Sequence, residues 1–180
     1  MTKGGVAFFD SGIGGLSVLH ACVSAGYDGV CYYYGDNARA PYGNLPMDRI
    51  RAYVDEAFEL FSYLQVRAVV VACNTVTAVC LDALRERYPF PIIGTEPALI
   101  PAAKQGGEIL LMATRATVES DRLRRLIDKT REMYPSAKIR AVACDGLAGG
   151  IEKGLPFSEL KKLLPTCAPD VVVLGCTHYI

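Results

Sequence analysis

Two cysteines that end runs of β-branched residues are the clearest candidates for chemistry in this sequence. Cys73 follows residues 69–72 (Val-Val-Val-Ala), and Cys176 follows residues 171–175 (Val-Val-Val-Leu-Gly). A continuous β-branched run bounded by small polar residues is typical of a strand that is buried on both faces of a parallel α/β sheet. Ligands of such sheets collect at the carboxyl ends of the strands. We therefore expect both thiols to lie beside one small substrate.

Two facing thiols suit the inversion of a stereocentre. One group, as a thiolate, removes a proton from a carbon acid, and the other, as a thiol, returns a proton to the opposite face; this is general acid–base catalysis without a cofactor. A pyridoxal enzyme would instead need a Schiff-base lysine. None of the lysines follows a predicted strand with cofactor-binding residues around it. The sequence therefore predicts a reaction that uses no cofactor.

The residues beside the two cysteines are candidates to tune their acidity. Asn74 and Thr75 are predicted to begin a helix directly after Cys73. A helix N-terminus lowers the pKa of a thiol, and its N–H groups can hold a substrate carboxylate. On an extended segment His178 points to the same face as Cys176, which makes it a candidate partner of that thiol. A metal site is not expected there, because the remaining ligands are missing.

Asp10 ends the first apolar run and precedes a glycine-rich turn at residues 11–15. By itself it is either a cap or turn aspartate, or a carboxylate that pairs with a substrate ammonium group or steers proton transfer at a thiol. The turn lacks the G-x-G-x-x-G spacing and no G-K-[ST] follows, so we interpret it as a tight turn that lets the backbone approach a ligand. Taken alone, Glu152 is interpreted as a solvated surface acid, and residues 41–43 (Pro-Tyr-Gly) as a turn.

Strands and helices are predicted to alternate along the chain. Strands are expected at residues 5–9 and 29–34, before Cys73, at 89–93, 108–112 and 138–143, and before Cys176. Helices are expected from the glycine-rich turn to about residue 25, from residue 44 through Leu64, after Cys73 to about Tyr88, over about 97–104, from Thr117 through Tyr134 and, as one or two short helices with Ser158 as an N-cap, over 147–164. This alternation predicts an α/β fold with mostly parallel sheets.

The two halves of the chain resemble each other. Each opens on a strand that ends in small polar residues, at 9–11 and at 112–114, and each later contains a Val-Val-Val strand that ends in cysteine. This weak repeat predicts two pseudo-symmetric lobes, residues 1–95 and 96–180, with helices flanking each sheet. A cleft between two lobes is a usual place for a ligand, so we expect the active site there.

Charge and composition argue against several classes of function. Lys+Arg and Asp+Glu both total 19, and a formal net charge of zero does not indicate nucleic acid or an anionic membrane as a partner. No apolar run approaches the roughly 20 residues that span a bilayer, and no signal-peptide pattern opens the sequence, which predicts a cytoplasmic protein. The seven cysteines are odd in number and include no C-x-x-C, which favours free thiols over disulfides or a structural zinc site.

Several motifs together resemble those of one family. They lie, in order, at residues 10–18 (Asp-Ser-Gly-Ile-Gly-Gly-Leu-Ser-Val), 35–38 (Gly-Asp-Asn-Ala), 41–43 (Pro-Tyr-Gly), 72–75 (Ala-Cys-Asn-Thr), 96–97 (Glu-Pro) and 175–179 (Gly-Cys-Thr-His-Tyr). The set closely resembles the glutamate racemases of the cofactor-independent aspartate/glutamate racemase family. The resemblance implies interconversion of L- and D-glutamate, with no cofactor or metal, to supply D-glutamate for bacterial peptidoglycan.

The same resemblance implies roles for individual residues. Cys73 would serve the proton on the D-face and Cys176 the proton on the L-face. Asp10 would assist Cys73, while Glu152 and His178 would assist Cys176. The carboxylates and ammonium group of the substrate would be held by a larger set, namely Asp10, Ser11, Pro41, Tyr42, Gly43, Cys73, Asn74, Thr75, Thr117, Cys176, Thr177 and His178.

The end of the sequence departs from the family pattern. Family members have a proline after His-Tyr and continue further, whereas here Ile180 stands at that position and is the last residue. The second lobe is therefore expected to be incomplete. Either the chain is a shortened product, or another copy of it supplies the missing cover in a homodimer.

Two other functions stay open on the sequence. A catalytically inactive relative would bind only glutamate or a protein partner. A hydrolase or lyase would use Cys176 as a nucleophile with His178 as its base, although one nucleophile needs no second cysteine at a matching position.

Overall fold

Four parallel strands form the sheet of the first lobe in the computed structural model, which describes residues 4–180. In the order β2-β1-β3-β4, they are β2 (Cys31–Gly35), β1 (Val6–Asp10), β3 (Ala68–Val71) and β4 (Ile92–Gly94). The register places Phe9 of β1 between Tyr34 of β2 and Val71 of β3. Because the strands are parallel, Asp10 and Cys73 lie at the same edge of this sheet.

Helices cover the first sheet and bury an apolar core against it. They are α1 (Leu16–Ser24), α2 (Met47–Tyr63) and α3 (Asn74–Arg87), with short 3-10 turns η1 (Asn37–Arg39) and η2 (Tyr42–Asn44) between β2 and α2. The buried positions of α2 recur every three or four residues, as the sequence predicts for a helix packed on a sheet: Ile50, Val54, Ala57, Phe58 and Phe61. Burying each large apolar side chain contributes about 1.5–3 kcal/mol, so this face holds α2 in place.

Three parallel strands form the sheet of the second lobe, in the order β6-β5-β7. They are β6 (Lys138–Ala143), β5 (Glu108–Ala113) and β7 (Val171–Gly175). The helices around them are α4 (Leu99–Gln105), α5 (Arg115–Val118), α6 (Asp121–Met133), α7 (Leu147–Glu152) and α8 (Phe157–Leu160), with 3-10 turns η3 (Lys161–Leu163) and η4 (Thr177–Tyr179).

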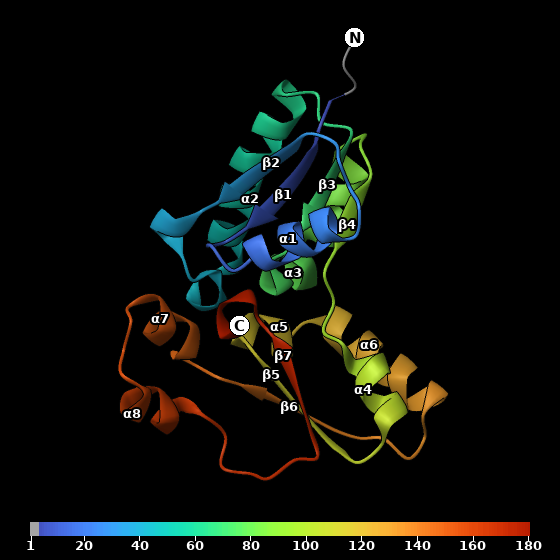
Figure 1. The fold of residues 1–180 in the computed structure, drawn as a ribbon, viewed down its shortest axis with the longest axis vertical. Helices are drawn as coiled ribbons and strands as arrows, with labels where there is room; N and C mark the ends of the chain where they lie inside the picture. The colour runs from blue at the N-terminus through green and yellow to red at the C-terminus, as the bar shows by residue number, and fades with distance from the viewer. Residues whose placement is uncertain (1–3) are drawn as a thin grey trace.

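The two sheets share one topology. In each, the first strand (β1 or β5) lies between the second strand (β2 or β6) and the Val-rich strand that precedes a cysteine (β3 or β7). The predicted class, two pseudo-symmetric α/β lobes with parallel sheets flanked by helices, is therefore confirmed. Figure 1 shows the two lobes one above the other, with the chain passing from the first to the second between β4 and α4.

Two details of the predicted helices are wrong. The single helix expected from Thr117 through Tyr134 is two helices, because the Ser120 side chain accepts a hydrogen bond from the N–H of Leu123 and caps a new helix, α6. Ser158 is not an N-cap; it lies inside α8, whose N-cap is Pro156. Elsewhere the expected elements are present with ends shifted by a few residues, such as β2, which begins at Cys31. None of the helices within residues 4–180 is long and apolar enough to cross a membrane.

Candidate active site

The ends of the two Val-rich strands meet at the junction between the lobes. Cys73 and Cys176 are both buried there, and the charge of Cys73 is close enough to raise the pKa of Cys176. The hydroxyl of Thr177, the residue after Cys176, donates across the junction to Oδ1 of Asp10 at 3.1 Å. The structure therefore brings the ends of β1, β3 and β7 together, as predicted from the strand pattern.

Cys73 is the N-cap residue of α3, and the hydroxyl of Ser11 lies 3.4 Å from its sulfur. The lowering of the pKa expected from the helix N-terminus is outweighed: the pKa of Cys73 is raised to about 11. Burial is the largest cause, and the negative charge of Asp10 adds to it. The N–H groups of Val76 and Ser11 and the Ser11 hydroxyl act in the opposite direction, but they do not compensate for the lost hydration of the thiolate.

Cys176 is the first member of a row of three ionisable side chains. Its sulfur lies 3.6 Å from Nδ1 of His178, and Nε2 of His178 lies 2.7 Å from Oε1 of Glu152. The second contact is an ion-pair distance without hydrogen-bond alignment of the ring N–H. Burial raises the pKa of Cys176 to about 12, although the N–H of His178 lowers it. A carboxylate, an imidazole and a thiol in sequence can move a proton to or from the sulfur.

Asp10 is fully buried and connects the glycine-rich turn to the second lobe. Oδ2 accepts hydrogen bonds from the N–H groups of Gly12 and Gly15, both at 3.1 Å, and the carboxylate also accepts the Thr177 hydroxyl. Burial raises the pKa of Asp10, while these three donors lower it. In the structure Asp10 thus lies beside both Cys73 and the residue next to Cys176.

A row of three threonine hydroxyls extends from the first lobe into the second. Oγ1 of Thr75 lies 2.9 Å from Oγ1 of Thr114, which lies 3.0 Å from Oγ1 of Thr117. Thr114 was absent from the predicted site residues. A signal for it was present, because Thr114 follows β5 where Ser11 follows the matching strand β1. Buried hydroxyls in a row can hold a carboxylate, so Thr114 joins the candidate binding set.

The loop at residues 41–43 is anchored in the core of the first lobe. The Tyr42 side chain is buried, and its hydroxyl donates to Oδ2 of Asp36 in a short hydrogen bond. Any contact between Tyr42 and a substrate must therefore come from its main chain. A side chain at Gly43 would meet Thr114 at 2.5 Å, so the main chain of this loop lies directly against the second lobe. Pro41 lies opposite Gly149 of α7.

Asn74 contacts the connection between the lobes. Its side-chain amide donates to the carbonyl of Thr95 at 3.1 Å. On the other side of the junction, a cavity of about 340 Å³ lies beside Glu152 and His178 and is bounded by Ile13 of the glycine-rich turn. All seven cysteines are free, and within residues 4–180 no cluster of three or more His, Cys, Asp or Glu side chains could hold a metal ion.

Replacing Tyr42 by Phe tests how the 41–43 loop is held. The change leaves the buried Asp36 carboxylate without its hydroxyl donor, and an unpaired buried acceptor costs about 1–3 kcal/mol. We expect the free energy of unfolding, measured by urea denaturation, to fall by about that amount. Tyr63→Phe is the matched control, because Tyr63 is 83% exposed. Equal stability of the two variants would show that the hydroxyl does not hold this loop.

Comparison with known proteins identifies the family. The Asp/Glu/Hydantoin racemase family matches residues 17–179. The glutamate racemase of Clostridium botulinum (strain Kyoto / Type A2) is 38% identical over 184 residues, which cover 97% of this chain and 70% of that protein, and the glutamate racemase of Clostridium perfringens (strain SM101 / Type A) is 40% identical over 188 residues.

Solved structures agree with the sequence relatives. The structure of Escherichia coli glutamate racemase in complex with L-glutamate and the activator UDP-MurNAc-ala is similar, with a TM-score of 0.82 and 32% identity over 97% of this chain and 70% of that one. The glutamate racemase from Francisella tularensis subsp. tularensis SCHU S4 in complex with D-glutamate gives a TM-score of 0.78 and 26% identity over 99% of this chain and 70% of that one. From these matches and the shared two-lobed fold, the chain belongs to the Asp/Glu/Hydantoin racemase family and, within it, to the glutamate racemases.

Proposed function

We propose that the chain interconverts L- and D-glutamate by moving a proton at the α-carbon between Cys73 and Cys176. The observation that carries the proposal is the burial of these two thiols at the facing ends of two equivalent sheets, with His178 and Glu152 in a row behind one of them. Relatives in complex with L-glutamate and with D-glutamate support the choice of substrate.

The proposed proton transfers balance without an external oxidant or reductant. Starting from D-glutamate, the Cys73 thiolate takes the α-proton and becomes a thiol, and the electron pair stays on the carbon. The Cys176 thiol then gives its proton to the opposite face and becomes a thiolate. A proton on His178, facing the Glu152 carboxylate, stabilises that thiolate. The reverse reaction starts from this second state.

The substrate is proposed to lie between the two lobes. Its ammonium group would pair with Asp10, and its carboxylates would accept hydrogen bonds from hydroxyls and main-chain N–H groups of both lobes. The residues proposed to line this site are Ser11, Pro41, Tyr42, Gly43, Asn74, Thr75, Thr117 and Thr177, with Thr114 added from the structure; Pro41 has no N–H and would contribute only packing.

Three wider features belong to the same proposal. We place the boundary between the lobes at residues 95 and 96, in the segment that connects β4 to α4. The reaction would take place in the cytoplasm and supply D-glutamate for peptidoglycan. Sedimentation analysis in solution would distinguish a monomer from the homodimer considered above.

Hydrogen exchange tests the function directly. The protein is incubated with D-glutamate in deuterated water, and the α-proton signal is followed by NMR together with optical rotation. We expect the α-proton signal and the optical rotation to be lost at matched rates. Binding by calorimetry without loss of the α-proton would support the non-catalytic alternative. A covalent adduct with burst kinetics would support the hydrolase or lyase alternative.

The pH dependence of kcat/KM tests the acidity of the two thiols. The pKa values of Cys73 and Cys176 are about 11 and about 12, and the reaction needs one group as a thiolate and the other as a thiol. The thiolate fraction grows about tenfold per pH unit below the lower pKa, so kcat/KM should rise from about pH 7 to about pH 10 without an alkaline decline in that range. The values are corrected for ionisation of the substrate amino group. A plateau beginning near neutral pH would contradict the raised pKa values.

A further inference from the structure

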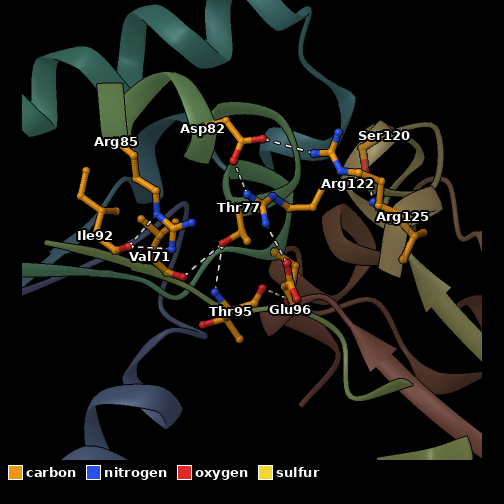
Figure 2. Close-up of polar contacts among 12 residues, drawn as sticks. Val71, Thr77, Asp82, Arg85, Ile92, Thr95, Glu96, Ser120, Arg122 and Arg125 are labelled. Atoms are coloured by element: carbon orange, nitrogen blue, oxygen red, sulfur yellow. Dashed lines mark hydrogen bonds and ion pairs between the residues drawn. The ribbon is translucent and has the colours of Figure 1, made fainter. Parts of the chain in front are cut away.

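An arginine at the junction of the lobes contacts acidic side chains from two other parts of the chain. Nη1 of Arg122, the second residue of α6, lies 2.8 Å from Oε1 of Glu96, and Nη2 pairs with Oδ1 of Asp82 on α3. The other oxygen of Asp82 lies 3.2 Å from Nη2 of Arg125. Figure 2 shows Arg122 between the two carboxylates. We call these four residues the Arg122 cluster; it joins α3, α6 and the segment between the lobes.

The local sequence does not favour an arginine at this place in a helix. A cation in the first turn faces the positive end of the helix dipole, where acidic side chains are preferred. Arg124, in the same helix, is an ordinary surface residue that is 71% exposed and pairs with Asp121 of its own turn. Arg122 is only 17% exposed, and its guanidinium fork spans two carboxylates. A residue that opposes a local preference and is buried by distant contacts indicates a role in tertiary structure.

The contact between Arg122 and Asp82 is rigidly linked to Cys73. Helix α3 begins directly after Cys73, and Asp82 lies eight positions beyond Asn74, about 12 Å along the helix axis. A helix of this length transmits a rotation at one end to the other. The position of Asp82 relative to α6 therefore sets how Cys73 faces the second lobe.

The contact with Glu96 fixes the connecting segment. The preceding residue, Thr95, donates its N–H to the carbonyl of Val71 at 3.0 Å, and its carbonyl accepts the Asn74 side chain at 3.1 Å. Glu96 thus leaves the first lobe from an anchored position. Its ion pair then holds the first residues of the segment against α6.

Arg122 is equally fixed relative to the second half of the site. The Ser120 hydroxyl donates to the carbonyl of Thr117 at 2.7 Å and accepts from the N–H of Leu123 at 3.1 Å. Helices α5 and α6 are therefore joined by a bonded turn, and Arg122 lies two residues past its centre. A movement of Arg122 moves Thr117 of the candidate binding set with it.

We propose that Arg122 is a positioning residue for racemisation, which sets the orientation of the two lobes so that both thiols reach one α-carbon; this inference rests on the proposed function. The Thr177–Asp10 and Thr75–Thr114 hydrogen bonds join the lobes at the active site, and the Arg122 cluster joins them beside the connecting segment. Contacts at two separated places prevent the rotation that contacts at one place alone permit. Without Arg122, Glu96 would lose this ion pair and Asp82 would keep its contact with Arg125 at 3.2 Å.

The test uses Arg122→Gln in the whole chain, with D-glutamate in deuterated water. Misplacement of about 1 Å at a reacting centre can cost about a hundredfold in rate, so kcat is expected to fall by about ten- to a hundredfold. A second readout follows deuterium at the α-carbon of recovered D-glutamate. In the parent chain, removal of the α-proton by Cys73 is followed promptly by protonation of the α-carbon from Cys176. In the variant, Cys73 has time to exchange with solvent, so recovered D-glutamate should gain deuterium without inversion.

Arg87→Gln is the matched control. Arg87 is the last residue of α3, the helix that carries Asp82, and it pairs with Asp55 and Glu59 at 2.7 and 2.9 Å, but all three residues belong to the first lobe. This change removes two ion pairs without touching the junction, and kcat and the deuterium pattern should match those of the parent. Arg122→Lys keeps the charge but not the fork and should recover part of kcat. Asp82→Asn combined with Arg122→Gln should be no worse than Arg122→Gln alone.

Lobe orientation is measured separately from activity, by small-angle X-ray scattering and by hydrogen exchange at the Thr95 N–H. Arg122→Gln should increase the radius of gyration and the exchange rate at Thr95, and Arg87→Gln should change neither. If Arg122→Gln matches Arg87→Gln in all readouts, the inference is wrong; if Arg122→Gln does not fold, Arg122→Lys and Asp82→Asn decide in the same way. If the parent chain does not racemise glutamate but the scattering difference is present, the proposed function fails while the lobe contact stands.

Discussion

Replacing either Cys73 or Cys176 by serine should lower the rate of racemisation by about 10³-fold or more in both directions, near the upper range for positioned acid–base groups. A serine hydroxyl is far harder to deprotonate than a thiol, so it can neither remove the α-proton at a useful rate nor hold the anionic state after donating its own. The measurement is kcat for L- and D-glutamate, with circular dichroism to confirm that each variant is folded.

Each lobe offers a matched control for loss of a thiol. Cys22 lies on α1 of the first lobe and Cys167 is exposed in the second, and both are free. Serine at these positions should leave kcat unchanged. The double variant of Cys73 and Cys176 should be no slower than either single variant, because groups that act as one unit lose their effect together. Unchanged rates in both single variants would overturn the two-thiol mechanism.

The strand ends could be predicted because a β-branched run has a simple cause. A strand buried on both faces needs apolar residues at every position, and it ends where polar residues begin. This rule predicted β3 and β7, and with them the places of Cys73 and Cys176, but burial of both faces is wrong for β7, where Val172 and Leu174 are exposed. The same rule, applied to the matching strand β5, would have identified Thr114 as a site residue.

The helix boundary near Ser120 could not be predicted from apolar spacing. The buried positions of α6, Leu123 and Leu126, continue the spacing of a single helix from Thr117. A serine caps a helix only where the backbone leaves the helical region, and the φ and ψ of Ser120 are −74° and 143°. The sequence contains the capping residue but does not state which conformation it adopts.

The acidity of the thiols depends on how closely the lobes approach. The N–H of Val76, in the first turn of α3, lowers the pKa of Cys73 as the sequence predicts. The larger effect is burial of the thiol at the junction of the two lobes. Spacing shows which face of an element is buried but not which distant side chain lies against it. For the same reason, spacing alone does not predict the Glu152–His178 and Arg122–Asp82 contacts.

The glycine-rich turn shows how closely the lobes approach, and it leads to the second large prediction. A Cβ atom built on Gly14 would lie 2.2 Å from the carbonyl oxygen of Thr177 and 2.6 Å from its carbon. Both are main-chain atoms beside Cys176, so neither can turn aside. Gly14 does not have a positive φ, which means that alanine suits the turn itself and conflicts only with the second lobe.

Gly14→Ala should therefore separate the lobes without unfolding either of them. Relief of the contact requires a shift of about 1 Å, and such a shift at a reacting centre can lower kcat by about a hundredfold. Gly149→Ala is the matched control, because a Cβ at Gly149 meets Pro41, also across the junction, at an ordinary 3.7 Å. Kinetics and urea denaturation of both variants decide the matter. Full activity of Gly14→Ala would show that the close approach of the turn to Thr177 is not needed during turnover. A loss of activity in Gly14→Ala alone, with its stability kept, would show that the catalytic geometry depends on the contact between the two lobes.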